Sequence, residues 1–236
     1  RTDYSRTDTL PNHTSMTTGR PVDQPAGQAN TVHHGYTGNS DPGGSDTLHN
    51  SGNSNLSYIA SAFDVAHDHG LSTALYASKS KFVIYEQSYN SSNGASDITG
   101  PDNGKDKIDS YVNDSSGLHA DFLTDMAASR FNYSFVHYRD PDDAGHGSGW
   151  CSSGWDDSIK DIDDYIGDIL ALIEGDGVLD GNTVIILTTD HGGTGTGHGS
   201  ASDPLNYTIP LFAWGSDVVV GADLYALNAG VRLDPV

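Results

Sequence analysis

Residues 156–189 constrain the fold of this chain more than any other region. Residues 156–174 place isoleucine and leucine on one helical face and aspartate on the opposite face. After a turn, residues 183–189 form an apolar run of strand length, as expected for a strand buried on both faces of a parallel sheet. An amphipathic helix followed by such a strand is typical of an α/β sheet covered by helices.

Other segments repeat this alternation of helices and strands. Apolar residues have helical spacing from Ile59 to a stop at Gly70, and again over residues 118–128. Short strand-like runs occupy residues 71–76, 82–85, 132–138 and 207–214. We therefore predict one α/β domain over residues 1–236, with an open, mostly parallel sheet and helices on both faces.

Two polar stretches interrupt the pattern. Residues 9–57 are rich in Gly, Pro, Asn, Thr and His without sustained periodicity, which predicts long surface loops. Residues 86–116 contain turn-forming Asn-Gly and Pro-Asp pairs and are predicted to be an inserted loop or cap. Because the chain starts with a polar run and ends abruptly at Val236, we expect it to be truncated at both ends.

The charge of the chain limits its partners and surroundings. Its net charge is −21, and all but two of its 32 acidic residues are aspartate. Such a surface repels nucleic-acid backbones, so duplex nucleic acid is not an expected partner. A hydrated acidic shell suits salty or extracellular surroundings, which predicts an extracellular or periplasmic location. No apolar run reaches the roughly 20 residues of a membrane span, and nothing indicates an oligomeric state.

Two clusters of Asp, His and Gly directly follow predicted strands. Asp142, Asp143 and His146 come just after the strand that ends at Tyr138. The second cluster follows the strand 183–189 and consists of Asp190, His191 and, a few residues on, His198. Strand ends of this kind place ligand-type side chains at the rim of a sheet, and two such clusters predict a metal site.

The residue types of these clusters indicate which metal they would bind. Carboxylate and neutral imidazole together suit zinc, manganese or iron better than calcium or magnesium, which prefer oxygen ligands. Cys151 is the sole cysteine, which excludes a cysteine-based site. Trp150 and Trp155, on either side of Cys151 beside the first cluster, are expected to pack rather than to bind substrate.

The segment from Thr9 to Pro21, with the sequence TLPNHTSMTTGRP, resembles the nucleophile region of the alkaline phosphatase superfamily. His34-Gly35 and Asn39 extend this resemblance, and the two Asp/His clusters follow in the order of that superfamily. The similarity is closest to the nucleotide pyrophosphatase/phosphodiesterase branch, also called type I phosphodiesterases. It implies an alkaline-phosphatase-like fold and the hydrolysis of a small phosphate-ester substrate, with a phosphodiester or nucleotide pyrophosphate favoured.

The resemblance also implies a role for each site residue. Thr9 is the expected nucleophile, and it would form a covalent phosphothreonine. Asn39 would donate a hydrogen bond to the phosphoryl oxygen, with Asn12 as the alternative. Two divalent ions are implied, with zinc favoured and manganese or iron as alternatives. The expected ligands of one ion are His146, His198 and Asp142, with Asp143 as the alternative to Asp142. The expected ligands of the other ion are Asp190, His191 and the Thr9 oxygen.

One feature of the superfamily has no counterpart in this chain. A further metal-binding Asp ends an opening strand upstream of the nucleophile, and here only Asp3 and Asp8 precede Thr9, outside that context. A sulfatase is not expected, because its Cys- or Ser-based nucleophile motif does not fit the sequence at Thr9. The alternatives that stay open are a phosphomonoesterase or phosphonate hydrolase of the same superfamily, or a secreted metal-binding protein without catalysis.

Overall fold

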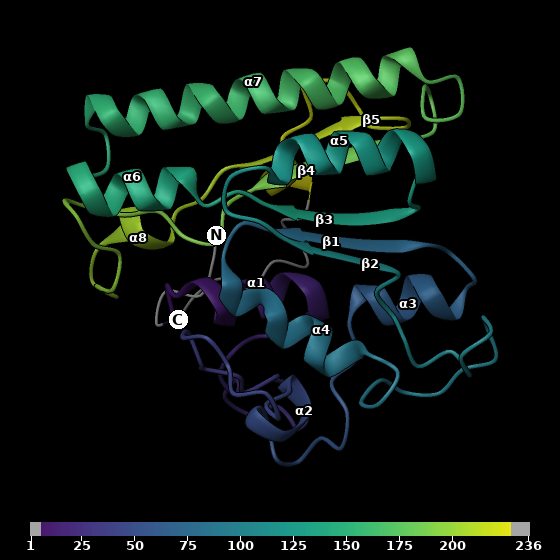
Figure 1. The fold of residues 1–236 in the computed structure, drawn as a ribbon. Helices are drawn as coiled ribbons and strands as arrows, with labels where there is room; N and C mark the ends of the chain where they lie inside the picture. The colour runs from purple at the N-terminus through teal and green to yellow at the C-terminus, as the bar shows by residue number, and fades with distance from the viewer. Residues whose placement is uncertain (1–5, 228–236) are drawn as a thin grey trace.

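The computed structural model describes residues 6–227, and its centre is a three-stranded parallel sheet in the order β2-β1-β3 (Figure 1). The strands are β1 (Thr73–Ala77), β2 (Ser110–Asn113) and β3 (Tyr133–His137). β1 pairs with β2 from Ala74 opposite Ser110 to Ala77 opposite Asn113. It pairs with β3 from Thr73 opposite Tyr133 to Ala77 opposite His137. The predicted parallel sheet is therefore confirmed.

β1 is buried on both faces because its side chains alternate between two hydrophobic cores. Leu75 and Ala77 join one core, and Ala74 and Tyr76 join the other, all without exposed surface. Figure 1 shows α5 (Leu118–Ser129) and α7 (Ser153–Gly175) over one face of the sheet. The opposite face is covered by α1 (Thr9–Thr18), α3 (Ala62–Asp68) and α4 (Val83–Tyr89). The predicted arrangement of helices on both faces is confirmed.

The described residues contain further helical elements. They are α2 (Leu48–Ser51), a 3₁₀ turn (Ser80–Phe82), α6 (Asp140–Ser148), α8 (Pro204–Tyr207) and α9 (Leu224–Leu227). The expected loop over residues 86–116 contains the last turn of α4 and the whole of β2.

Two segments are helical where the sequence predicted otherwise. Residues 9–18, expected to be loop, form α1, which buries Leu10 in the core and ends at Gly19 in the left-handed conformation at φ 65°. Residues 82–85, expected to be a strand, belong to the 3₁₀ turn and α4. There Phe82, Tyr85 and Tyr89 are all buried at the spacing of one helical face, a period that a four-residue window does not reveal.

The last strand pair also differs from the prediction. β4 (Val184–Thr188) pairs only with β5 (Leu211–Gly215) among the described residues, and the pairing is antiparallel. Ile185 packs against the core on the α5/α7 side of the sheet. Val184 and Ile186, which alternate with it, are 51% and 67% exposed. The expectation that this strand is buried on both faces of a parallel sheet is therefore wrong in this structure.

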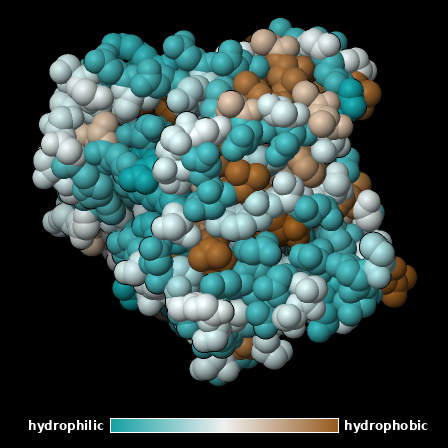
Figure 2. Space-filling view, viewed as in Figure 1, coloured by the Kyte–Doolittle hydropathy of each residue, from teal (hydrophilic) through white to brown (hydrophobic). Residues whose placement is uncertain are grey.

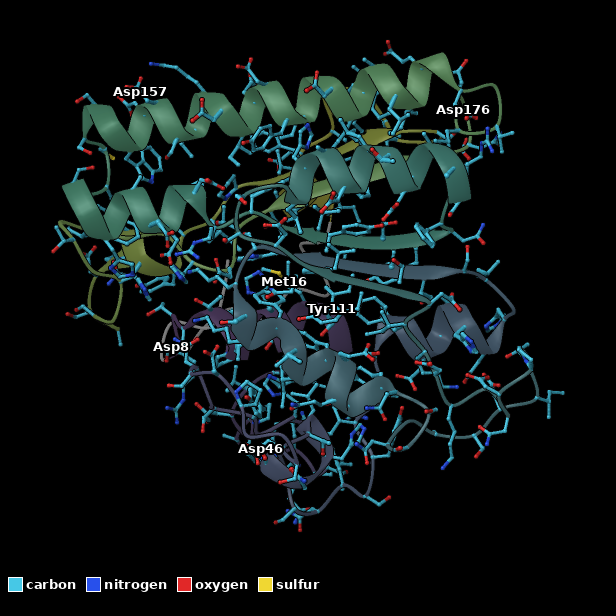
Figure 3. All side chains as sticks on the ribbon, viewed as in Figure 1. Asp8, Met16, Asp46, Tyr111, Asp157 and Asp176 are labelled. Atoms are coloured by element: carbon cyan, nitrogen blue, oxygen red, sulfur yellow. The ribbon has the colours of Figure 1, made fainter. Side chains whose placement is uncertain are left out.

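The surface follows the composition of the chain. On the face shown in Figure 2, hydrophilic residues predominate and apolar residues are scattered among them. Acidic side chains mark α7 along its length, and Figure 3 shows Asp157 near one end of this helix and Asp176 just beyond the other. Among residues 6–227, no helix combines the length and the apolar character that crossing a bilayer requires.

Candidate functional site

The predicted site residues come from elements that meet at one end of the sheet (Figure 1). β3 leads into α6, which carries Asp142 and His146 one turn apart on the same side of the helix. Asp190, His191 and His198 lie in the loop between β4 (Val184–Thr188) and α8, with Asp190 and His191 near its start. The start of α1, preceded by Asp8 in Figure 3, lies at the same end. The carboxyl ends of parallel strands are the usual place for ligands in such sheets.

Three imidazoles surround one carboxylate oxygen. Oδ1 of Asp142 lies 3.5 Å from Nε2 of His146, 3.8 Å from Nε2 of His191 and 4.0 Å from Nε2 of His198. The Nε2 atoms of His146 and His198 are themselves 3.2 Å apart. The ligand atoms of Asp142, His146 and His198 lie within 4.8 Å of one another, close enough to hold a metal ion.

The other nitrogen of each ring determines its tautomer. Nδ1 of His146 donates to the carbonyl of Thr196 at 3.0 Å, and Nδ1 of His191 donates to its neighbour Gly192 at 2.9 Å. Nδ1 of His198 donates to the carbonyl of Thr7. A neutral imidazole with its proton on Nδ1 carries a lone pair on Nε2, which is the form that ligates metal. The three lone pairs therefore face the same carboxylate.

Two atoms of this cluster lack the partners that buried polar atoms normally have. Oδ1 of Asp142 and Nε2 of His191 are both buried and make no hydrogen bond within the described residues. A lone pair facing a carboxylate oxygen is repulsive unless a cation lies between them. The donor set of Asp142, His146 and His198, one carboxylate and two imidazoles, suits zinc. These residues therefore fit a divalent ion.

The neighbour of Asp142 is placed differently. The Asp143 carboxylate accepts from Nε of Arg139 one turn earlier on the exposed side of α6. The arrangement favours Asp142 over Asp143 as the ligand.

Asp190 connects the cluster to the start of α1. Oδ2 of Asp190 lies 3.3 Å from Nε2 of His191 and 3.5 Å from Nδ1 of His13. Nδ1 of His13 donates to the carbonyl of Thr9 at 2.7 Å. His13 was not among the residues assigned a role from the sequence, although it lies in the nucleophile-like string. It links the predicted nucleophile to the second predicted ligand pair.

Thr9 and the two candidate asparagines lie on α1 or beside it and differ in their surroundings. Thr9 is the first residue of α1 and is 3% exposed. Oδ1 of Asn39 accepts from the backbone nitrogen of Leu10 at 3.1 Å, so Asn39 lies beside the predicted nucleophile. Asn12 is 1% exposed inside α1, and both polar atoms of its amide are buried without a partner among residues 6–227. The geometry favours Asn39 over Asn12 for contact with a substrate.

The sequence reading missed a group of cations beside these residues. An open depression of about 310 Å³ is lined by Asn39, Ser40, Asp41, Lys79, Ser80, Lys81 and Arg139. Lys79 pairs with Asp142, and Nζ of Lys81 donates to Oδ1 of Asn39 at 2.9 Å. Both lysines follow β1, the central strand, so their place just after a predicted strand was the signal that could have found them.

The electrostatics of the cluster follow from burial and from these cations. Burial acts to raise the pKa of Asp142, but the Lys79 ammonium and the neighbouring histidines outweigh it, so the pKa lies below its ordinary value. Burial lowers the pKa of His198 and of His13. Burial, with Lys79 as the next cause, also lowers the pKa of Lys81. The carboxyl of Asp142 is thus held in its ionised form and the imidazole of His198 in its neutral form, which are the forms that bind metal.

Comparison with known proteins places this geometry in context. The model of a family described as type I phosphodiesterase / nucleotide pyrophosphatase matches residues 2–214. Murine ectonucleotide pyrophosphatase / phosphodiesterase 5 is similar in fold, with a TM-score of 0.51 and 20% identity over 79% of this chain. A second structure of that protein, an inactive threonine-to-alanine variant in complex with AMP, gives a TM-score of 0.52 and 18% identity over the same 79%.

A shorter stretch is similar to a curated protein. GPI ethanolamine phosphate transferase 1 of Mus musculus is 33% identical over 87 residues, which are 36% of this chain. The chain covers 46% of the two phosphodiesterase structures and 9% of the transferase. It therefore spans less than half the length of each of these relatives.

Proposed function

Because the chain belongs to the type I phosphodiesterase / nucleotide pyrophosphatase family, we propose that it hydrolyses phosphate esters, with a phosphodiester or nucleotide pyrophosphate as substrate. The observation that carries the proposal is the cluster around Oδ1 of Asp142, where three Nε2 lone pairs face a buried, unpartnered carboxylate oxygen. This arrangement serves no purpose in packing alone, since buried polar atoms without partners cost stability.

The residues of the cluster divide into two ligand sets. Asp142, His146 and His198 would hold one divalent ion, and Asp190 and His191 would hold the other with the Thr9 oxygen. We favour zinc because imidazole and carboxylate suit it, with manganese or iron as alternatives. Bound ions of this kind lower the pKa of a coordinated hydroxyl and neutralise the charge of a phosphate. Neutralisation matters here, because the surface of charge −21 otherwise repels an anionic substrate.

Thr9 would act as the nucleophile at the start of α1. Its Oγ1 would lose its proton to water and attack phosphorus, and the bond from phosphorus to the leaving oxygen would break. That oxygen would keep the electron pair and take up a proton from water, and phosphothreonine would form. Water then cleaves the phosphothreonine and restores the hydroxyl. The positive end of the α1 dipole favours the anionic phosphoryl group at this position. His13, hydrogen-bonded to the Thr9 carbonyl and close to Asp190, holds the first turn of α1 in place beside the second ligand set.

The cationic depression supplies contacts for the substrate. The amide oxygen of Asn39 already accepts from Leu10 and Lys81, which orients its Nδ2 as a donor for a phosphoryl oxygen. Lys79 and Arg139 offset the carboxylates of Asp142 and Asp143, and Lys81 adds a further cation beside Asn39 in a chain with only 11 lysines and arginines. Such a cluster attracts the anionic part of a phosphate ester.

The proposal is tested by metal analysis of the purified protein together with hydrolysis of bis-p-nitrophenyl phosphate and p-nitrophenyl phosphate. We expect two zinc equivalents and release of p-nitrophenol from the diester. Thr9→Ala should lower kcat by at least about 10³-fold and leave the zinc content nearly unchanged. Thr9→Ser, which keeps a hydroxyl, is the matched control and should retain part of the activity.

Other results would favour the alternatives. Faster turnover of the monoester would indicate a phosphomonoesterase, and turnover of a phosphonate alone would indicate a phosphonate hydrolase. Bound zinc without any turnover would indicate a metal-binding protein without catalysis. A fully active Thr9→Ala variant would exclude this nucleophile.

Group transfer is a second candidate function. The observation that favours it is the 33% identity over 87 residues to an ethanolamine phosphate transferase. In transfer, the hydroxyl of an alcohol rather than water would attack the phosphothreonine. Product analysis in the presence of glycerol separates the two reactions, because transfer yields a glycerol phosphodiester and hydrolysis yields the free phosphate ester.

A further inference from the structure

The indole of Trp150 lies against two of the histidines of the proposed metal site. Its ring is 5.2 Å from the ring of His146 at 82° and 5.8 Å from the ring of His198 at 72°. The two imidazoles are themselves 5.0 Å apart. Edge-to-face contacts of this kind are favourable for aromatic rings. The three rings therefore form one cluster.

Glycines on two separate elements make room for this indole. A Cβ at Gly145 on α6 would lie 2.6 Å from the Trp150 ring, and one at Gly193 in the loop after β4 would lie 2.2 Å from it. The backbone nitrogen of Trp150 donates to the carbonyl of Gly195 at 2.8 Å in that same loop. The indole thus fills a slot between the two segments that carry the histidines.

We propose that Trp150 is a positioning residue that holds His146 and His198 in the orientation that binds metal. Each imidazole is already tied at Nδ1 to a backbone carbonyl, of Thr196 or of Thr7. One hydrogen bond fixes a single point of each ring, so the ring can still pivot about that point, and the indole on its side opposes this motion. His146 has the greater need for this support, since its side chain is 46% exposed. This inference rests on the proposed metal site.

The sequence alone could not reveal this role. Trp150 was expected to pack, and it does, but its partners are two predicted ligands rather than the hydrophobic core. Residues that orient metal ligands typically change metal affinity by about 10- to 100-fold when they are removed. The role therefore predicts an effect on metal binding that ordinary packing does not.

Zinc affinity, measured by competition with a chromophoric chelator, tests the proposal. Trp150→Ala should bind zinc about 10- to 100-fold more weakly than the wild type, and Trp150→Phe should recover much of the loss because it keeps an aromatic ring. Trp214→Ala, a change at a half-exposed tryptophan on β5, is the control and should leave the affinity unchanged. Cobalt-substituted protein should show an altered visible spectrum in Trp150→Ala only.

The space that Gly145 on α6 leaves for the indole offers an independent test. Gly145→Ala forces the indole to move, whereas a Cβ at Gly147 meets nothing within 4 Å. We expect Gly145→Ala to weaken zinc binding and Gly147→Ala to leave it intact. Equal affinity in Trp150→Ala, Gly145→Ala and the wild type would overturn the proposal while leaving the metal site in place. A wild-type protein that binds neither zinc, manganese nor iron would overturn the proposed function as well.

Discussion

His34 is buried without exposed surface, and its hydrogen bonds suit a neutral ring. Nδ1 accepts from the backbone nitrogen of Tyr36 at 3.0 Å, and Nε2 lies 3.1 Å from Oγ of Ser15. Burial, with His33 as the next cause, lowers the pKa of His34 to about 4. The folded protein therefore excludes a proton that the unfolded chain binds readily.

This difference predicts how stability depends on pH. As the pH falls below the unfolded value of 6.5, the unfolded state takes up a proton on His34 while the folded state does not until the pH nears about 4. The stability that the fold gains from a neutral His34 is fully present above pH 6.5. It is lost as the pH falls towards 4, which lowers the free energy of unfolding by up to about 3 kcal/mol. Urea unfolding measured from pH 7 to pH 4 should show it.

The matched variant is His34→Asn, whose amide oxygen can still accept from the nitrogen of Tyr36. Its unfolding free energy should fall less steeply over the same pH range, because Asn does not titrate. The same slope in both proteins would contradict the assignment to His34.

Helices and strands were predicted correctly where the segment was long enough to show its hydrophobic period. The helix over residues 156–174 appears as α7, and residues 118–128 and 132–138 appear as α5 and β3. The prediction failed at α1, whose threonines and asparagine have weak helix propensity and are held by packing of Leu10 in the core. Tertiary packing overrode the local preference there.

The loop between α4 and β2 is held by a buried cation. Lys107 has no exposed surface and pairs with Asp68 at 2.6 Å and with Asp97 at 2.8 Å. Asp97 also accepts from the backbone nitrogen of Thr99 at 2.9 Å. Such a pair tolerates little displacement, because removing one partner leaves a buried charge uncompensated.

Gly104 lies directly against this ion pair, which gives a prediction for the loop. It has a φ of 74°, and a Cβ there would lie 1.2 Å from Oδ1 of Asp97. Gly27 has the same φ of 74° with nothing within 4 Å, so Gly27→Ala carries the same backbone strain without the clash. We expect Gly104→Ala to lower the unfolding free energy by about 3 kcal/mol more than Gly27→Ala in urea titrations. Equal losses of unfolding free energy in the two variants would show that the loop accommodates the new Cβ without disturbing the ion pair.

Repulsion between like charges is the dominant long-range contribution to the stability of the whole molecule. The net charge of −21 on 236 residues makes the compact state repel itself, and few exposed cations offset it. Raising KCl from 0.01 M to 0.3 M shortens the screening length from about 30 Å to about 6 Å. We expect the melting temperature to rise by about 5 °C over this range, with calorimetry as the measurement. A constant or falling melting temperature would show that favourable ion pairs outweigh the repulsion.

The sequence by itself determined the helices with long periods, the acidic surface, the family resemblance and which Asp and His residues follow strands. These properties depend on residues that are near one another in the chain or on composition alone. Only the tertiary structure decided that Asp142 faces three imidazoles, that Lys79 and Lys81 adjoin them, and that β4 pairs only with β5 within the described residues. Such contacts join segments far apart in the chain, and the free energy that selects them comes from burial and pairing across the fold, which no local pattern encodes.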